Sequence, residues 1–165
     1  MESNRIINYK NEKINFSWCP WCAYAKHEFN LPCGMIYEND NFTLSQDREL
    51  PIVGFLIISP KKHVETLNEL SVKEINEMFW IVNNVIKIMK ENNICDEFNV
   101  IFEEKKKVHF HVRIMPRHKW MMKICNSITK NIGLIFDYAK ENFRNKDTYN
   151  KIEKTVNIIR DQLKI

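Results

Sequence analysis

Two histidines and one arginine alternate with apolar residues between positions 108 and 114. Successive side chains of a β-strand point to opposite faces, so His109, His111 and Arg113 would share one face, with about 6.6–6.8 Å between alternate residues. The opposite face would then be apolar and directed to the core: Val108, Phe110, Val112 and Ile114. The pattern predicts a short row of proton-transferring and cationic groups. A half-exposed strand with ordinary polar residues outside is the alternative interpretation.

Cys19 and Cys22 are separated by two residues, a spacing that lets both thiolates reach one zinc ion. Two thiolates do not complete a tetrahedral site, so histidines must supply the other ligands. His63 follows an apolar run and His109 lies on the predicted row, and both would converge on the cysteines if their strands adjoin. The other histidines are His27, His111 and His118. A thioredoxin-like dithiol is the competing interpretation, because Trp-Cys-x-x-Cys before a helix can lower a thiol pKa.

The composition excludes several classes of protein. The chain has 165 residues, 44% of them hydrophobic and 28% charged, which is typical of one soluble globular domain. Its net charge of +4 is mild and spread along the chain, which gives little support to nucleic-acid binding but suits a small anionic ligand. The three glycines stand far apart, so no glycine-rich phosphate loop exists.

The expected location is the cytoplasm, with no membrane partner. No apolar run approaches the roughly 18 residues of a membrane span, and the first thirteen residues are too polar for a signal peptide. The five cysteines should then be reduced. Three of them have the features of inert thiols: Cys33, Cys95 and Cys125.

The elements that would position these residues can be predicted from the pattern of apolar residues. Residues 1–17 are predicted to be a polar arm, and short strands are predicted at 35–37, 42–44 and 53–59. Ser71-Val-Lys-Glu74 is a capping box, and apolar residues then recur every three or four positions to about residue 91, which predicts an amphipathic helix. Strands at 98–103 and 107–115 flank a short turn and predict an antiparallel hairpin.

The last 45 residues are predicted to be helical. A heptad-like row of apolar residues predicts packing along another helix of this chain or of a partner subunit: Tyr149, Ile152, Val156, Ile159 and Leu163. The fold class is therefore α+β, an antiparallel sheet with a long amphipathic helix and a helical C-terminal extension. The expected division is an arm at 1–17, a domain at 18–120 and an extension at 121–165.

The sequence resembles the histidine triad family. His109-Phe-His111-Val-Arg113-Ile-Met-Pro-Arg is similar to the family signature, with Arg113 in place of the third histidine. Upstream, the segment 51–65 is similar to the family's Pro-x-x-Gly-His strand followed by Pro-Lys-x-His. The order of the elements also matches over residues 18–120.

The resemblance implies specific roles. By analogy with zinc-bearing members and the related galactose-1-phosphate uridylyltransferases, zinc would be held by Cys19, Cys22, His63 and His109. His111 would be the nucleophile that attacks the α-phosphorus of a nucleotide and forms a nucleotidyl-histidine intermediate. Such an imidazole must be neutral, and a neighbouring Arg113 would favour that state and stabilise phosphoryl oxygens. The alternative role for Arg113 is an ion pair with Glu103 or Glu104.

Two features depart from the family pattern. Residues 103–107 (Glu-Glu-Lys-Lys-Lys) occupy the place of a longer Gly-Gln-Ser-like phosphate-binding loop, and Phe55 replaces a histidine. The candidates for contacts with phosphate or the leaving group are Asn99, Lys107 and His118, although each is also an ordinary surface or hairpin residue.

Three hypotheses about function follow. The first is a zinc-stabilised nucleotidyl hydrolase or transferase acting on a nucleoside phosphate. The second is a module that binds a nucleotide or another phosphorylated small molecule without turnover. The third is a dithiol oxidoreductase that uses Cys19 and Cys22. We also expect a homodimer, as is common in the resembled family, and no specific nucleic-acid partner.

Overall fold

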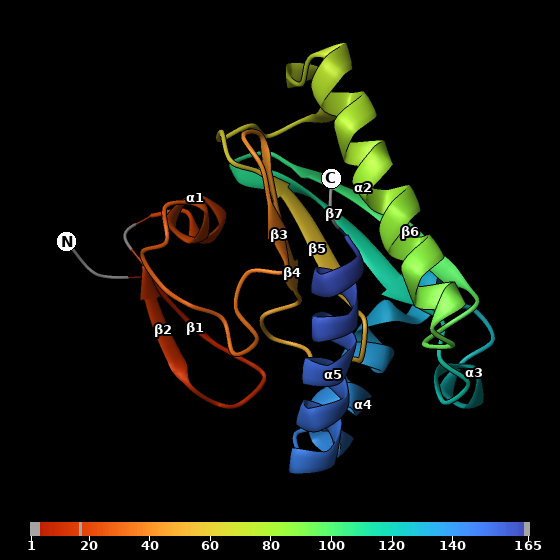
Figure 1. Cartoon of the computed structure of the whole chain (residues 1–165). Helices are drawn as coiled ribbons and strands as arrows, with labels where there is room; N and C mark the ends of the chain where they lie inside the picture. The colour runs from red at the N-terminus through yellow and green to blue at the C-terminus, as the bar shows by residue number, and fades with distance from the viewer. Residues whose placement is uncertain (1–3, 17, 164–165) are drawn as a thin grey trace.

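A five-stranded antiparallel sheet forms the centre of the protein in the computed structural model, which describes residues 4–16 and 18–163 (Figure 1). The strand order is β3-β4-β5-β7-β6. The bounds of the strands are β3 (Tyr37–Glu38), β4 (Phe42–Gln46), β5 (Leu56–Pro60), β6 (Phe98–Lys105) and β7 (Val108–Pro116). The sheet and its helices confirm the predicted α+β class.

Strand β7 has the predicted alternation. Phe110, Val112 and Ile114 are fully buried in the main core, whereas His109 and His111 lie on the opposite face. Its partner β5 begins at Leu56 rather than at residue 53, because the preceding residues form a turn. Gly54 has a φ of 72° there, and a Cβ at this position would meet the Met89 Cε at 3.2 Å.

The register of the β6–β7 hairpin determines which β6 side chains lie beside His111 and Arg113. Its register pairs Ile101 with Arg113 and Glu103 with His111, so these four side chains lie on one face. Lys107 ends the short turn with a φ of 63°. The structure confirms the predicted antiparallel hairpin and places Glu103 directly across from His111.

Helix α2 (Val72–Glu91) lies along the sheet (Figure 1). It packs on the face that carries Phe110, Val112 and Ile114, which is opposite to the histidines of β7. Ser71 caps it as predicted, because its hydroxyl accepts from the Glu74 amide and the Glu74 carboxylate accepts from the Ser71 amide. Most residues of the apolar stripe predicted for this helix pack against the main core. Phe79 is an exception: it is 47% exposed and packs against Phe102 at the rim, while Ile81 is fully buried.

The predicted C-terminal seam packs within the chain. It lies on helix α5 (Lys146–Gln162), and Ile152, Val156, Ile159 and Leu163 belong to the same buried cluster as α2 and the sheet. Helices α3 (Met121–Ile124) and α4 (Ile132–Asn142) instead build a second cluster around Phe55 and Met115. Two short 3-10 turns span Leu67–Glu69 and Thr129–Asn131. Residues 164–165 of the expected extension lie outside the described residues.

The expected polar arm contains a hairpin, which corrects the prediction for this segment. Strands β1 (Asn4–Ile7) and β2 (Lys13–Phe16) pair antiparallel and lead to helix α1 (Pro20–Ala25). The Asn8 side chain holds the turn by accepting from the amides of Lys10 and Glu12. Only one face of the hairpin is covered, and Ile14 is the one buried residue in its two strands, so no long apolar run reveals it. Residues 1–3 and 17 of the expected arm lie outside the described residues.

In the described part of the chain, no helix combines the length and apolar character needed to cross a membrane.

The packing of α5 can be tested by truncating a side chain in its buried row. Ile159→Ala should lower the free energy of unfolding by about 2–5 kcal/mol, because Ile159 is fully buried between α5 and the main core. The matched control on the exposed side of the helix is Glu153→Ala, for which we expect a change within about 0.5 kcal/mol. Urea denaturation would measure both. Equal stabilities of the two variants would show that α5 does not pack on the sheet.

Candidate active site and metal centre

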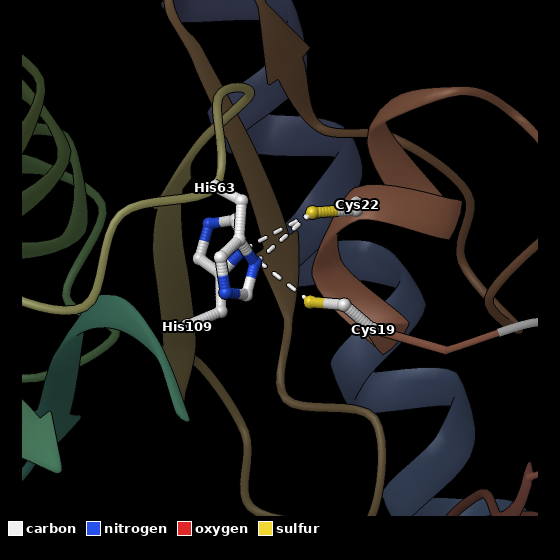
Figure 2. A group of neighbouring side chains, drawn as sticks. All are labelled: Cys19, Cys22, His63 and His109. Carbon is white, nitrogen blue, oxygen red and sulfur yellow. Dashed lines mark hydrogen bonds between the residues drawn. The ribbon is translucent and has the colours of Figure 1, made fainter. Parts of the chain in front are cut away.

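Two cysteines and two histidines from three separate segments meet beside the sheet (Figure 2). Cys19 is the N-cap of α1 and Cys22 lies in its first turn, so the short helix directs both sulfurs to the same side. His63 follows β5, and His109 comes from β7. Their potential ligand atoms all lie within 4.8 Å of one another. The structure thus brings together the four residues predicted as metal ligands.

The distances within this cluster are those of atoms that face a common centre. The Nδ1 atom of His109 is 3.4 Å from the sulfurs of both Cys19 and Cys22, and Nδ1 of His63 is 3.4 Å from the Cys22 sulfur. The other ring nitrogen of His109, Nε2, donates to the Pro60 carbonyl at 2.9 Å. This hydrogen bond fixes the tautomer, because it leaves the Nδ1 lone pair directed at the sulfurs.

The electrostatics of the cluster also suit a cation. Burial, together with the neighbouring His63 and His111, lowers the pKa of His109 to about 4, so its imidazole is neutral. Burial and the neighbouring Cys19 raise the pKa of Cys22 to about 12. A metal ion would offset both effects by stabilising thiolates, and its binding would release protons. The donor set and the fixed His109 tautomer therefore fit a metal ion.

These properties disfavour the dithiol oxidoreductase. A reactive thiol needs a lowered pKa and access to its substrate. Cys19 and Cys22 are only 5% and 4% exposed, and both sulfurs face the His109 ring rather than solvent.

His111 lies two positions beyond His109 and faces a cavity of about 500 Å³. Its Nδ1 donates to the His109 carbonyl at 3.0 Å, which leaves the Nε2 lone pair unprotonated. Burial is the main reason that its pKa is lowered, and the positive charge of Arg113 lowers it further. The Trp21 ring lies 5.3 Å from the imidazole and restricts its position. His111 is thus held as a neutral imidazole whose Nε2 carries no proton.

Arg113 contacts both Glu103 and His111. Its Nε lies 2.8 Å from a Glu103 carboxylate oxygen and donates to Nε2 of His111 at 3.3 Å. The guanidinium also lies 5.9 Å from the centre of the Phe136 ring. Glu104, the other expected partner, instead accepts from the amide of Leu67 on the far side of the hairpin.

The loop after β4 adds residues to the cavity that the sequence analysis missed. Arg48 lies over the Trp21 ring at 4.6 Å, and Asp47 accepts from the amides of Glu49 and Leu50 at 2.8 and 2.9 Å. Burial raises the pKa of Asp47, whereas these amides and nearby arginines lower it. No local pattern marks this loop, because its position beside Trp21 results from the fold.

The three candidate substrate contacts lie in different places. Lys107 lines the same cavity as His111. His118 belongs to a second cavity, where its Nε2 donates to the Val53 carbonyl at 2.8 Å. Asn99 pairs with Met115 near the far end of the hairpin, and it is not among the residues that line the His111 cavity. The geometry therefore corrects the grouping: His118 and Asn99 do not join Lys107 beside His111.

Residues 28–120, more than half of the chain, match the family model of the HIT domain. A curated relative is an uncharacterised HIT-like protein of Methanocaldococcus jannaschii, 25% identical over 107 residues that cover 61% of this chain and 80% of the relative.

Solved structures show the same fold. A zinc-bound histidine triad family protein from Mycobacterium smegmatis matches with a TM-score of 0.58 and 17% identity, over 84% of this chain and 93% of that one. The Plasmodium falciparum diadenosine triphosphate hydrolase, solved with cyclomarin A, matches with a TM-score of 0.53 and 16% identity, over 79% of this chain and 76% of that one.

The metal centre can be tested by exchanging one sulfur. Cys22→Ser should lower the affinity for a divalent metal by at least roughly tenfold, because a thiolate ligand is lost from a four-ligand set. Competition with a chromophoric chelator would measure the affinity of purified protein. The control is Cys95→Ser, which removes a thiol that donates to the Glu97 carbonyl outside the cluster. Equal metal affinity in both variants would contradict the assignment.

Proposed function

The chain belongs to the HIT, or histidine triad, family, and from this we propose that it is a nucleotidyl hydrolase or transferase acting on a nucleoside phosphate. The observation that carries the proposal is the state of His111. Its Nδ1–H is held by the His109 carbonyl, and its Nε2 faces a cavity lined by Arg113 and Lys107. A neutral imidazole with a fixed tautomer is the form that a nucleophilic histidine needs.

In the proposed reaction, the lone pair on His111 Nε2 attacks the α-phosphorus of the substrate. A nitrogen–phosphorus bond forms, the bond to the leaving-group oxygen breaks, and the leaving group departs with the electron pair and takes a proton from solvent. Water or the hydroxyl of a second acceptor then attacks the phosphorus. An oxygen–phosphorus bond forms, the nitrogen–phosphorus bond breaks and returns its electron pair to Nε2, and the attacking oxygen loses its proton to solvent. Throughout, the His109 carbonyl holds the proton on Nδ1 and stabilises the positive charge that develops on the ring.

Cationic side chains would stabilise the transferred phosphoryl group. Arg113 is nearest to the nucleophile, with its Nε 3.3 Å from Nε2 of His111. Lys107 and Arg48 line the same cavity. Preorganised cations aimed at developing negative charge are worth most in a site that is partly closed to water. We assign Arg113 to this role and Lys107 to phosphate binding.

We propose that the metal is zinc, held by Cys19, Cys22, His63 and His109. Two thiolates and two imidazoles form a closed tetrahedral set of the kind used in structural zinc sites. The ion would supply cross-linking rather than bond making, since all four positions are filled by the protein. It would tie α1 to β7 and so fix the strand that carries His111.

The alternative is a module that binds a nucleotide or another phosphorylated small molecule without turnover. Two observations favour it. The β6–β7 turn is short, and the attacking nitrogen of His111 already accepts from Arg113, with a Glu103 oxygen 3.6 Å away. Homodimer formation also stays a prediction, but the seam on α5 would not supply the interface, since it is buried in the chain's own core.

The covalent intermediate gives the test of the proposed reaction. After mixing with dinucleoside polyphosphates, nucleotide sugars and nucleoside phosphoramidates, the intact mass should increase by one nucleotidyl group. His111→Gln should abolish this adduct and reduce turnover by at least roughly 10³-fold, because the nucleophile is removed. The metal content of this variant should stay unchanged.

The matched control is His118→Gln, which alters a histidine in the other cavity and should leave the adduct intact. An adduct that persists in His111→Gln would contradict the proposal. Nucleotide binding without any adduct would support the binding module instead.

A further inference from the structure

The attacking nitrogen of His111 is covered by an ion pair. The Nε–H of Arg113 donates to Nε2 of His111 at 3.3 Å, and the same Nε lies 2.8 Å from a Glu103 oxygen in an ion pair. The same Glu103 oxygen lies 3.6 Å from Nε2. A carboxylate therefore occupies the space beside the atom that must approach phosphorus in the proposed reaction.

Four carboxylates line the cavity, and Glu103 is the one that forms an ion pair with Arg113, whereas Asp47 feels the charge of Arg113 at longer range. Asp47 accepts from backbone amides, and Glu49 pairs with Arg48 at 3.1 Å. Glu65 accepts from the Lys107 amide at 2.9 Å. Glu103 alone pairs with Arg113, and its side chain is 37% exposed, so it has room to turn away toward solvent.

The anionic oxygens of a bound phosphoryl group need the same position. They must lie beside Nε2 for attack and beside the Arg113 guanidinium for stabilisation, and two anions cannot share that place without strong repulsion. We propose that Glu103 is a specificity-determining residue that occupies the place of the phosphoryl oxygens on Arg113 and must be displaced by the substrate.

This inference rests on the proposed function and adds a substrate preference. A phosphoryl group with one negative charge meets less repulsion from Glu103 than a terminal phosphate with two charges. The site thus favours a phosphorus that is substituted on both sides, as in an ester or anhydride of a nucleoside monophosphate, over a free nucleotide end.

Three adenosine compounds provide a graded test: AMP, which is mostly a dianion at pH 8, the monoanionic methyl ester of AMP, and uncharged adenosine. Calorimetry on the metal-loaded protein would measure each dissociation constant. Glu103→Gln keeps the shape of the side chain and removes its charge. It should tighten AMP binding about tenfold and the methyl ester about threefold, and leave adenosine unchanged. The gain should shrink as salt is added.

The matched control is the next residue. Glu104→Gln removes the same charge from the same hairpin, but Glu104 faces the Leu67 amide and not the cavity. Its binding constants should stay within about twofold of the original protein. A gain in affinity also separates the proposal from structural damage, which would weaken binding of all three compounds.

The outcomes distinguish this inference from the proposed function. AMP binding that is equal in Glu103→Gln and the original protein would overturn the role of Glu103 alone. Weaker AMP binding in Glu103→Gln would likewise overturn it, and would show that the carboxylate supports Arg113. Absence of binding of all three compounds to every form of the protein would overturn both proposals.

Discussion

One residue, His109, connects the two halves of the site. Its ring donates from Nε2 to the Pro60 carbonyl and directs Nδ1 to the sulfurs of Cys19 and Cys22, while its own backbone carbonyl accepts from Nδ1 of His111. The metal cluster and the proposed nucleophile are therefore positioned by the same residue of β7. A movement of β7 would displace both the metal ligand His109 and the proposed nucleophile His111.

The rest of the fold contacts β7 on both of its faces and along both of its edges. Its apolar face is covered by α2 and α5, which belong to one buried cluster with the sheet. The β6 strand pairs along it and brings Glu103 across from His111, while β5 pairs on its other side. The short helix α1 adds the two cysteines and Trp21, whose ring packs beside His111. Elements distant in sequence thus meet around a strand of nine residues.

Much of this could be predicted because the relevant patterns are local. The period of two in β7 determines that His109 and His111 share a face, and the capping box at Ser71 marks the start of α2. The metal cluster needed one additional assumption, that the strands before His63 and around His109 adjoin, and β5 and β7 do pair. The β1–β2 hairpin was missed because most of its residues are polar and its buried contacts come from distant segments.

Other parts of the site depend on tertiary packing and had no local signal. Arg48 reaches the cavity only because the loop after β4 places its guanidinium over Trp21. His118 follows β7 closely in sequence, yet the chain turns after Pro116 and places it in a different cavity. The pairing of Glu103 rather than Glu104 with Arg113 depends on the hairpin register, which a sequence with acidic residues at both positions leaves open.

The central claim is that two histidines on one strand have opposite tautomers for different purposes. Long-range ¹⁵N–¹H correlation spectra of the metal-loaded protein, with the ring signals assigned by substitution, test it directly. The account predicts that at neutral pH His109 carries its proton on Nε2, and that His111 carries its single proton on Nδ1. A doubly protonated His111, or a His111 ring with its proton on Nε2, would contradict the account.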